Sequence, residues 1–320
     1  MRGVAFDLAH ALREIVLPRL GAADGRAHAR ESVGGDVTFA IDAEAEAFLA
    51  GWVAANAPQM AFYSEDRGMV TPGEDRPELV LIVDPIDGTR PALAGFEAAC
   101  TSVALAPLGE GEPTMGDVVA GCVVEIKSGE WFDAERGAGC RASRPIALSE
   151  NTDLERLFWV YGFTRRPARA VVEVIGELID RSSLGGGVFD LGSATFDLTR
   201  ILTGQLDAYV EPGARMVAEI PGMREQFARV GGGSVVNNSP YDLAAAALCL
   251  SEGGAVITDA AGRPLGPYRL LGSDPDFHIS CVAAASSALH AMLLDTVERG
   301  MERLRTLDIV PPPQPDQEGP

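Results

Sequence analysis

The chain has 320 residues, of which 47% are hydrophobic and 22% are charged, and its formal net charge is −20. A chain of this length and composition is globular and can bury a large core in one domain or in two closely joined domains. The negative charge argues against binding to long nucleic acid, because no basic stripe is present to displace counterions. No apolar run reaches the ~18–20 residues that span a bilayer, so we expect no membrane attachment and no signal peptide.

The cysteines and histidines limit the chemistry further. Five cysteines are dispersed without metal-ligand spacing: Cys100, Cys122, Cys140, Cys249 and Cys281. An odd, scattered set of thiols favours buried, reduced side chains and a cytoplasmic location. Four histidines lie away from every acidic cluster: His10, His28, His278 and His290. A histidine zinc site or a Ser-His-Asp triad is therefore poorly supported.

Residues 1–145 predict an α+β half with a mixed or antiparallel sheet. An amphipathic helix is predicted at 4–20, and a polar, glycine-containing stretch follows at 30–37. A second helix at 42–56 is acidic in its first turn and apolar later. Strands are predicted at 61–63, 79–83, 99–107, 117–127 and 129–133.

Residues 146–300 predict an α/β half, because strands and helices alternate along the chain. Strands are predicted at 157–163, 206–210 and 255–258, and helices at 167–180, 193–203 and 241–252. Residues 280–300 begin as a strand and continue as a helix. Ser193 fits the N-cap of its helix. Residues 301–320 form a tail, rich in proline from Pro311, that we expect to be partly disordered.

The most informative segment is residues 84–89, Asp84-Pro-Ile-Asp87-Gly88-Thr89, directly after the apolar run 79–83. Two carboxylates this close repel each other unless a cation neutralises them, and oxygen ligands of this kind suit Mg²⁺. Gly88 allows a ligand to approach the backbone. The alternative is a strand followed by an ordinary Asp-Pro turn.

Three other apolar elements end in acidic groups. Asp42 follows 38–41, Glu65 and Asp66 follow 62–63, and Asp242 stands in the Ser-Pro-Tyr-Asp run 239–242. Each has a simpler interpretation, because Asp42 and Asp242 could cap helices and the Glu-Asp pair could lie in a solvated loop. Nothing in the periodicity shows that these segments meet in space.

Together these motifs resemble the inositol monophosphatase family of Mg²⁺-dependent, lithium-sensitive sugar phosphatases. That family has an Asp-Pro-Ile-Asp-Gly-Thr loop, preceded by a Glu-Glu pair and followed by Trp-Asp-x-Ala, which match 84–89, 65–66 and 241–244. Further matches keep the family's order over roughly 5–298: 35–38, 135–139, 192–194, 206–211 and 252–259. The Gly-Asp-x-Thr form at 35–38 and the Glu-Asp pair look more like the archaeal-type inositol monophosphatase/fructose-1,6-bisphosphatases.

The resemblance implies a layered αβαβα sandwich, a homodimer and a phosphomonoesterase. The enzyme would use metal-activated water on a small phosphorylated polyol, sugar or nucleotide. Fructose-1,6-bisphosphatase and 3′-phosphoadenosine phosphatase activities are alternatives within the same class. A non-catalytic member that binds a metal or a phosphate is the alternative from another class.

The resemblance also assigns roles to individual residues. Two or three Mg²⁺ ions would be held by oxygen ligands at one site: Glu65, Asp66, Asp84, Ile86 (through its carbonyl), Asp87 and Asp242. Asp42 and Thr89 match the catalytic pair that orients and deprotonates the attacking water. The amides of Gly88 and Thr89 would hold the phosphate. Hydroxyl groups of the substrate would meet the residues that match Gly192, Ser193, Ala194 and Glu211.

The chain departs from the family pattern in four places. Tyr241 replaces the usual Trp, Asp66 replaces the second Glu, and Arg90-Pro91 replaces a frequent Asn-Phe. The largest departure is an inserted segment of about residues 212–240, which contains Arg215, Arg224 and Arg229. We expect this segment to act as a lid or specificity loop in which one arginine meets an anionic group of the substrate. A peripheral surface excursion or a dimer contact is the alternative.

Overall fold

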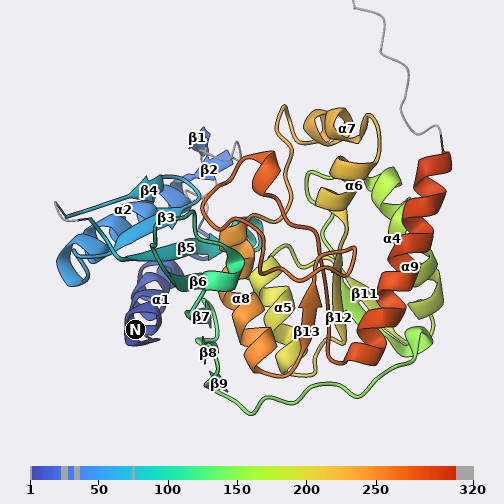
Figure 1. The fold of residues 1–320 in the computed structure, drawn as a ribbon, viewed down its shortest axis with the longest axis horizontal. Coiled ribbons are helices and arrows are strands. Elements are labelled where there is room, and N and C mark those ends of the chain that lie inside the picture. Colours follow the sequence, from blue (N-terminus) through green and yellow to red (C-terminus); the bar gives the residue numbers. More distant parts are fainter. Residues whose placement is uncertain (1, 23–27, 32–36, 74–75, 308–320) are drawn as a thin grey trace, which may run out of the picture.

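The computed structural model describes residues 2–22, 28–31, 37–73 and 76–307. Two β-sheets alternate with three layers of helices across the molecule (Figure 1). The helices of these layers are α1 (Arg2–Val16) and α2 (Ala40–Asn56), then α5 (Ala194–Leu202) and α8 (Pro240–Glu252), then α4 (Ala168–Ser182) and α9 (Ser287–Thr306). The layered αβαβα sandwich that the resemblance implies is confirmed.

The first sheet has the order β4-β3-β5-β6-β7-β8-β9. Its strands are β3 (Ala61–Ser64), β4 (Gly68–Val70), β5 (Leu79–Asp87), β6 (Cys100–Pro107), β7 (Ala120–Glu125), β8 (Trp131–Glu135) and β9 (Gly139–Ala142). β3 is parallel to β5, and the other neighbours in this sheet pair antiparallel. The mixed sheet predicted for this half is confirmed. β1 (His28–Glu31) and β2 (Val37–Phe39) form a separate antiparallel pair.

The second sheet has the order β11-β10-β12-β14-β13. Its strands are β10 (Phe158–Val160), β11 (Gly187–Phe189), β12 (Ala208–Glu211), β13 (Val256–Thr258) and β14 (Cys281–Ala284). β10 is parallel to both β11 and β12, whereas β14 is antiparallel to β12 and β13. Strands and helices alternate here as predicted. The division into 1–145 and 146–300 stays a prediction.

The hydrophobic core follows the layers. One cluster of buried side chains lies around α5 and α8, between the two sheets. A second joins the outer face of the second sheet to α4 and α9, and a third joins the first sheet to α1 and α2. Because α5 and α8 pack between the sheets, their N-terminal ends are held beside β5, where the central aspartates lie.

Sequence and structure differ mainly at the edges of the sheets. The short strands β4, β9 and β11 were not expected, and all three are edge strands that pair on one side. The helix α3 (Thr89–Ala94) is too short to show a periodic pattern, and its Pro91 lies in the first turn, where proline is tolerated. The apolar strand does not end at residue 83, because β5 continues to Asp87. The tail predicted at 301–320 starts later than expected, because α9 continues to Thr306. Residues 308–320 and part of the 35–38 motif lie outside the described residues.

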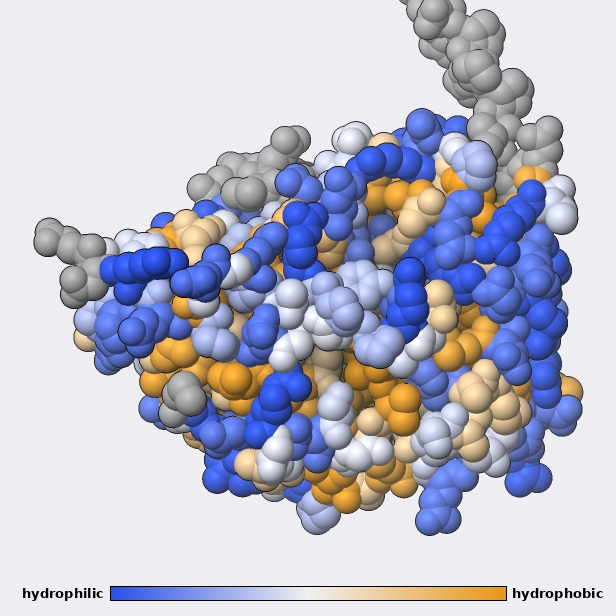
Figure 2. Space-filling model, viewed as in Figure 1, coloured by the Kyte–Doolittle hydropathy of each residue, from blue (hydrophilic) through white to orange (hydrophobic). Residues whose placement is uncertain are grey.

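The inserted segment is helical, with α6 (Gly213–Glu219) and α7 (Met223–Val230). Short 3-10 helices occur at Leu17–Arg19, Met115–Asp117, Leu154–Arg156 and Pro275–Phe277. Hydrophilic residues dominate the surface on the α4 and α9 side (Figure 2), where arginines of α9 pair with glutamates of α4. No helix among the described residues has the length and apolar character of a membrane span.

Candidate metal centre

The two aspartates of the central motif face one cavity because β5 contains a bulge. Side chains of a regular strand alternate between its faces, so residues three positions apart, such as Asp84 and Asp87, would point in opposite directions. In the pairing with β6, Asp84 lies opposite Ser102 and Asp87 lies opposite Cys100, so β5 has one residue more than its partner. A bulge of this kind redirects the following side chain. Pro85 lies inside the bulge, where the ladder needs no amide donor.

Asp84, Asp87 and Asp242 each place one carboxylate oxygen within 4.8 Å of the others. Burial raises the pKa of Asp84 well above its ordinary value, and the charges of Asp87 and Asp242 raise it further. Burial and the Asp87 charge raise the pKa of Asp242 to about 8. Three like charges in so little space are unfavourable unless a cation neutralises them. The donor set contains only carboxylate oxygens, which Mg²⁺ prefers, so these residues fit a divalent cation.

Asp87 is fixed by the start of α5. The Ser193 hydroxyl donates to Asp87 Oδ2 at 2.9 Å, and the Thr195 backbone amide donates to the same oxygen. Burial raises the pKa of Asp87, and these hydrogen bonds oppose that rise. Ser193 also accepts from a backbone amide of α5, so its predicted role as N-cap is confirmed. Ser193 therefore links the 84–89 segment to the helix layer between the sheets.

Gly88 permits this close approach. Its φ is 91°, in the left-handed region that side-chain-bearing residues rarely adopt. A Cβ at this position would lie 2.5 Å from the Ala98 carbonyl oxygen and 2.8 Å from Ser193 Cβ. Any larger residue would therefore push the motif away from α5.

Asp42 and Thr89 form a hydrogen-bonded pair, as expected for residues that act together. Thr89 Oγ1 donates to Asp42 Oδ1 at 3.1 Å, and it lies 3.2 Å from the Ile86 carbonyl oxygen. The second oxygen of Asp42 accepts from the Phe39 amide at 2.9 Å and caps α2. Asp42 therefore caps α2, and the contact with Thr89 leaves its catalytic role a prediction. A hydroxyl that donates to a carboxylate keeps lone pairs that can accept a hydrogen bond from a water.

Asp242 likewise caps its own helix, α8. Its Oδ2 accepts from the Ser239 amide at 2.6 Å, in a capping box with Pro240 at the first helical position. The capping prediction is confirmed. The backbone carbonyl of Asp242 accepts from Thr195 Oγ1 at 2.9 Å, which ties α8 to α5. The cap orients the carboxylate toward the two aspartates of β5.

A cavity of about 160 Å³ contains most of the predicted site residues. The predicted residues that line it are Glu65, Asp84, Ile86, Asp87, Gly88, Thr89, Gly192, Ser193, Ala194 and Asp242. Asp42 and Asp66 line a smaller adjoining cavity, to which Glu65 and Thr89 also contribute. Glu211 lines neither cavity, because it is 1% exposed and forms an ion pair with Arg166. The structure thus gathers every predicted site residue except Glu211.

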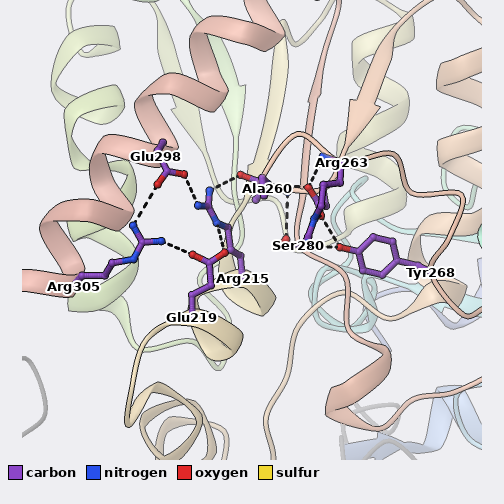
Figure 3. A network of polar contacts seen from close by, with 10 residues as sticks. Arg215, Glu219, Ala260, Arg263, Tyr268, Ser280, Glu298 and Arg305 are labelled. Atoms are coloured by element: carbon purple, nitrogen blue, oxygen red, sulfur yellow. Dashed lines mark hydrogen bonds and ion pairs between the residues drawn. The ribbon is translucent and has the colours of Figure 1, made fainter.

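The inserted segment borders the cavity through residues 235–239, but not through an arginine. Arg215 instead joins α6 to α9 by pairing with Glu298, and within α6 it pairs with Glu219 at 2.9 Å (Figure 3). It also donates to the Ala260 carbonyl at 2.9 Å. Arg224 and Arg229 likewise do not line the cavity. The described structure therefore gives no support to the expectation that an arginine of this segment meets the substrate, and the lid role stays a prediction.

Sequence reasoning missed several residues that line the cavity. Arg166 and His278 lie in loops, and Asn237 and Asn238 belong to the inserted segment. Burial, helped by the nearby Arg166 charge, lowers the pKa of His278 to about 4, so its imidazole is neutral at pH 7. Glu46 of α2 lines the adjoining cavity and accepts from Ser64 Oγ at 2.9 Å. Of these residues, only Glu46 could have been placed near the site from the sequence, because it stands one helical turn after Asp42.

Known proteins are similar to this chain over most of its length. The inositol monophosphatase family model matches residues 1–302. A fructose-1,6-bisphosphatase/inositol-1-monophosphatase of Methanothermobacter thermautotrophicus is 26% identical over 93% of this chain and 96% of its own length. The Nus factor SuhB of Vibrio cholerae serotype O1 is 25% identical over 71% of this chain and 73% of its own.

A solved structure shows the same fold. The extragenic suppressor protein suhB from Bartonella henselae superposes with a TM-score of 0.69 at 20% identity, over 93% of this chain and 98% of its own. The resemblance drawn from the sequence motifs is confirmed, including the likeness to an inositol monophosphatase/fructose-1,6-bisphosphatase. The chain belongs to the inositol monophosphatase family, a metal-dependent family of phosphoric monoester hydrolases.

Proposed function

We propose that this chain is a Mg²⁺-dependent phosphomonoesterase that releases phosphate from a small phosphorylated polyol, sugar or nucleotide. The observation that carries the proposal is the convergence of Asp84, Asp87 and Asp242 in one cavity, with the Thr89–Asp42 pair beside it. Two or three cations are proposed, with Glu65, Asp66 and the Ile86 carbonyl as additional ligands. Bound Mg²⁺ would neutralise these carboxylates and the phosphate, and would lower the pKa of a nearby water.

Residues of the chain position the attacking water and the phosphate. Thr89 Oγ1 is held by its bond to Asp42, so it can accept a hydrogen bond from the attacking water. Asp42 is the proton acceptor for that water, and its cap bond to the Phe39 amide keeps the carboxylate in place. The backbone amides of Gly88 and Thr89, beside the aspartates, are proposed to bind the phosphate oxygens. Fixed donors of this kind stabilise the charge that spreads over a transferring phosphoryl group.

Phosphate release from a panel of esters tests the proposal. p-Nitrophenyl phosphate, inositol 1-phosphate, fructose 1,6-bisphosphate and 3′-phosphoadenosine 5′-phosphate would each be incubated with Mg²⁺, with EDTA, and with Mg²⁺ plus Li⁺. We expect release with Mg²⁺ that EDTA abolishes and Li⁺ inhibits. A protein that releases no phosphate from any ester but still binds Mg²⁺ would support the non-catalytic alternative, which the similarity to a Nus factor keeps open. The homodimer and the cytoplasmic location also stay predictions.

A further inference from the structure

Two thiols from distant parts of the sequence meet at the edge of the first sheet. Cys140 lies in β9, and Cys249 lies near the end of α8. Their side chains form a hydrogen bond, and Cys140 packs against the buried cluster that contains Cys249. Both thiols are free in this structure. Thiols that already touch need only a small approach of their sulfur atoms to form a disulfide.

The register of the first sheet turns Cys140 toward α8. Gly121 of β7 pairs with Ala134 of β8, which in turn pairs with Cys140. Residues directly opposite one another point to the same face of a sheet. That face meets α8 at Gly121, where a Cβ would lie 2.9 Å from Ala245 Cα. One helical turn after Ala245, Cys249 Sγ lies 3.9 Å from the Gly121 carbonyl oxygen. The two cysteines therefore come from surfaces that pack directly on each other.

A second contact holds the end of α8 against the same strands. Glu252 follows Cys249 by three positions, so the two residues share one side of the helix. The Glu252 carboxylate accepts from the Gly137 amide at 2.8 Å and from the Gly139 amide at 2.9 Å. Gly139 directly precedes Cys140 in β9. The thiol contact is therefore held by the packing of a helix on a strand and not by a loop.

The two thiols differ in exposure and in acidity. Cys249 is buried, whereas Cys140 is half-buried and lines a surface cavity of about 430 Å³ formed by residues 140–146. The hydrogen bond from Cys249 lowers the pKa of the Cys140 thiol, and the same bond, together with burial, raises the pKa of the Cys249 thiol. Because the thiolate is the form that an oxidant attacks, Cys140 is the thiol that reacts first.

We propose that Cys140 and Cys249 form a modification site at which a hydroperoxide generates a reversible disulfide between β9 and α8. In the first step the Cys140 sulfur attacks hydrogen peroxide, the O–O bond breaks, and a sulfenic acid and hydroxide form. The Cys249 sulfur then attacks the sulfenic sulfur, so that the S–S bond forms and the S–O bond breaks. The departing oxygen leaves as water with the Cys249 proton. The two sulfur atoms lose two electrons in total, and the peroxide gains them.

The disulfide would join α8 covalently to the first sheet. The first turn of α8 carries Asp242, so one helix connects the thiol pair to the aspartates of the cavity. A disulfide restrains the unfolded chain, and it does so more strongly when the closed loop is long, as the loop 140–249 is. The inference does not depend on the proposed phosphomonoesterase activity, because it concerns the reactivity of the thiols alone.

Peptide mapping after peroxide treatment tests the proposal. The full chain would be reduced, freed of reductant, treated with hydrogen peroxide, blocked with N-ethylmaleimide in denaturant and digested without reductant. We expect mass spectrometry to find one cross-link, between the peptides that contain Cys140 and Cys249, and we expect dithiothreitol to reverse it. The oxidised protein should melt about 5 °C or more above the reduced protein.

Three variants identify the two sulfur atoms. Cys249→Ala should stop the reaction at a sulfenic acid on Cys140, which dimedone traps, and should abolish the rise in melting temperature. Cys140→Ser should leave Cys249 reduced, because burial shields it. Cys122→Ala is the matched control, since Cys122 adjoins Gly121 in β7 but packs in the cluster of α1 and α2. This control should form the cross-link as the wild type does.

Three results would overturn the inference. The first is a wild type in which Cys140 is oxidised, or is joined to a second chain, while Cys249 stays reduced. The second is a wild type in which neither thiol reacts at a peroxide concentration that oxidises free cysteine. The third is a Cys140–Cys249 cross-link that lowers the melting temperature, since such a bond would strain the fold. None of these results bears on the proposed function, because no phosphate ester enters the assay.

Discussion

The two sides of the cavity are built by different means. On one side, Asp84 and Asp87 come from a single strand with one bulge, and Asp242 comes from the cap of a helix. On the other side, Arg166 and His278 come from separate loops that only the tertiary fold brings together. The first side is organised by short motifs with their own hydrogen bonds, whereas the second depends on how distant segments pack.

We therefore expect the aspartate side to carry out the reaction and the loop side to determine which substrate is preferred. A change among the aspartates should affect every ester equally, because all substrates share the phosphate. A change at Arg166 or in the inserted segment should alter which ester is preferred. The four predictions below test this separation.

The largest effect is expected for Asp84→Asn. Removing this charge should lower Mg²⁺-dependent phosphate release by more than about 1,000-fold for every ester, because the central cation ligand is lost. The same substitution should raise the melting temperature of the metal-free protein, since it relieves repulsion among three buried carboxylates. Asp295→Asn, an exposed aspartate of α9, is the control and should change neither quantity. Full activity in the Asp84 variant would contradict the assignment of Asp84, Asp87 and Asp242 as cation ligands.

Thr89→Ala should lower kcat by about 100-fold or more with little change in KM, because the substitution removes the hydroxyl that orients the water. Thr89→Ser keeps an oxygen in reach of Asp42 and should restore most of the rate. Steady-state kinetics on one neutral and one doubly charged ester would measure kcat and KM for both variants. If the loss differed strongly between the two esters, Thr89 would belong to substrate choice rather than to chemistry.

The metal-free protein should lose stability as the pH rises. The pKa of Asp242 is raised from 3.8 to about 8 in the folded state, so the folded protein retains a proton there that the unfolded chain releases. The free energy of unfolding should therefore fall from about pH 5 to about pH 8 in EDTA. Saturating Mg²⁺ should flatten this profile, because the cation stabilises the ionised carboxylates. Urea denaturation across this range measures both curves, and a flat profile in EDTA would contradict the prediction.

The smallest effect is expected far from the chemistry, at the anchor of the inserted segment. Arg215→Met removes a side chain that joins α6 to α9 and to the Ala260 carbonyl (Figure 3), and should lower the free energy of unfolding by about 1–3 kcal/mol. We expect KM to rise modestly while kcat is kept. Arg299→Met, a more exposed arginine of α9, should cost less than about 1 kcal/mol. Equal losses of unfolding free energy in the two variants would show that the contacts of Arg215 stabilise the fold no more than those of an exposed arginine.

Much of the fold was predictable because it is encoded locally. Ser193 and Ser239 cap their helices where the sequence places them, and the buried apolar runs form the central strands. The edge strands β4, β9 and β11 were not predictable, since they are three or four residues long and are defined by pairing with a neighbour. The bulge in β5 also leaves no clear pattern, although it decides where Asp87 points.

The candidate site shows the same limit. The aspartates could be proposed from one motif and one cap, and the structure gathers them as expected. Glu211 was expected at the cavity because it matches a position that meets substrate hydroxyls in the family, yet it is buried in an ion pair with Arg166. That pair depends on a loop remote in sequence, so no spacing or periodicity could reveal it.

Direct Mg²⁺ binding tests the central claim, that Asp84, Asp87 and Asp242 hold a cation. Isothermal titration calorimetry would compare the wild type with Asp242→Asn and with the control Asp295→Asn. We predict saturable binding by the wild type and the control, and at least a tenfold weaker affinity, or one binding event fewer, in Asp242→Asn. Identical isotherms for all three proteins would contradict the account.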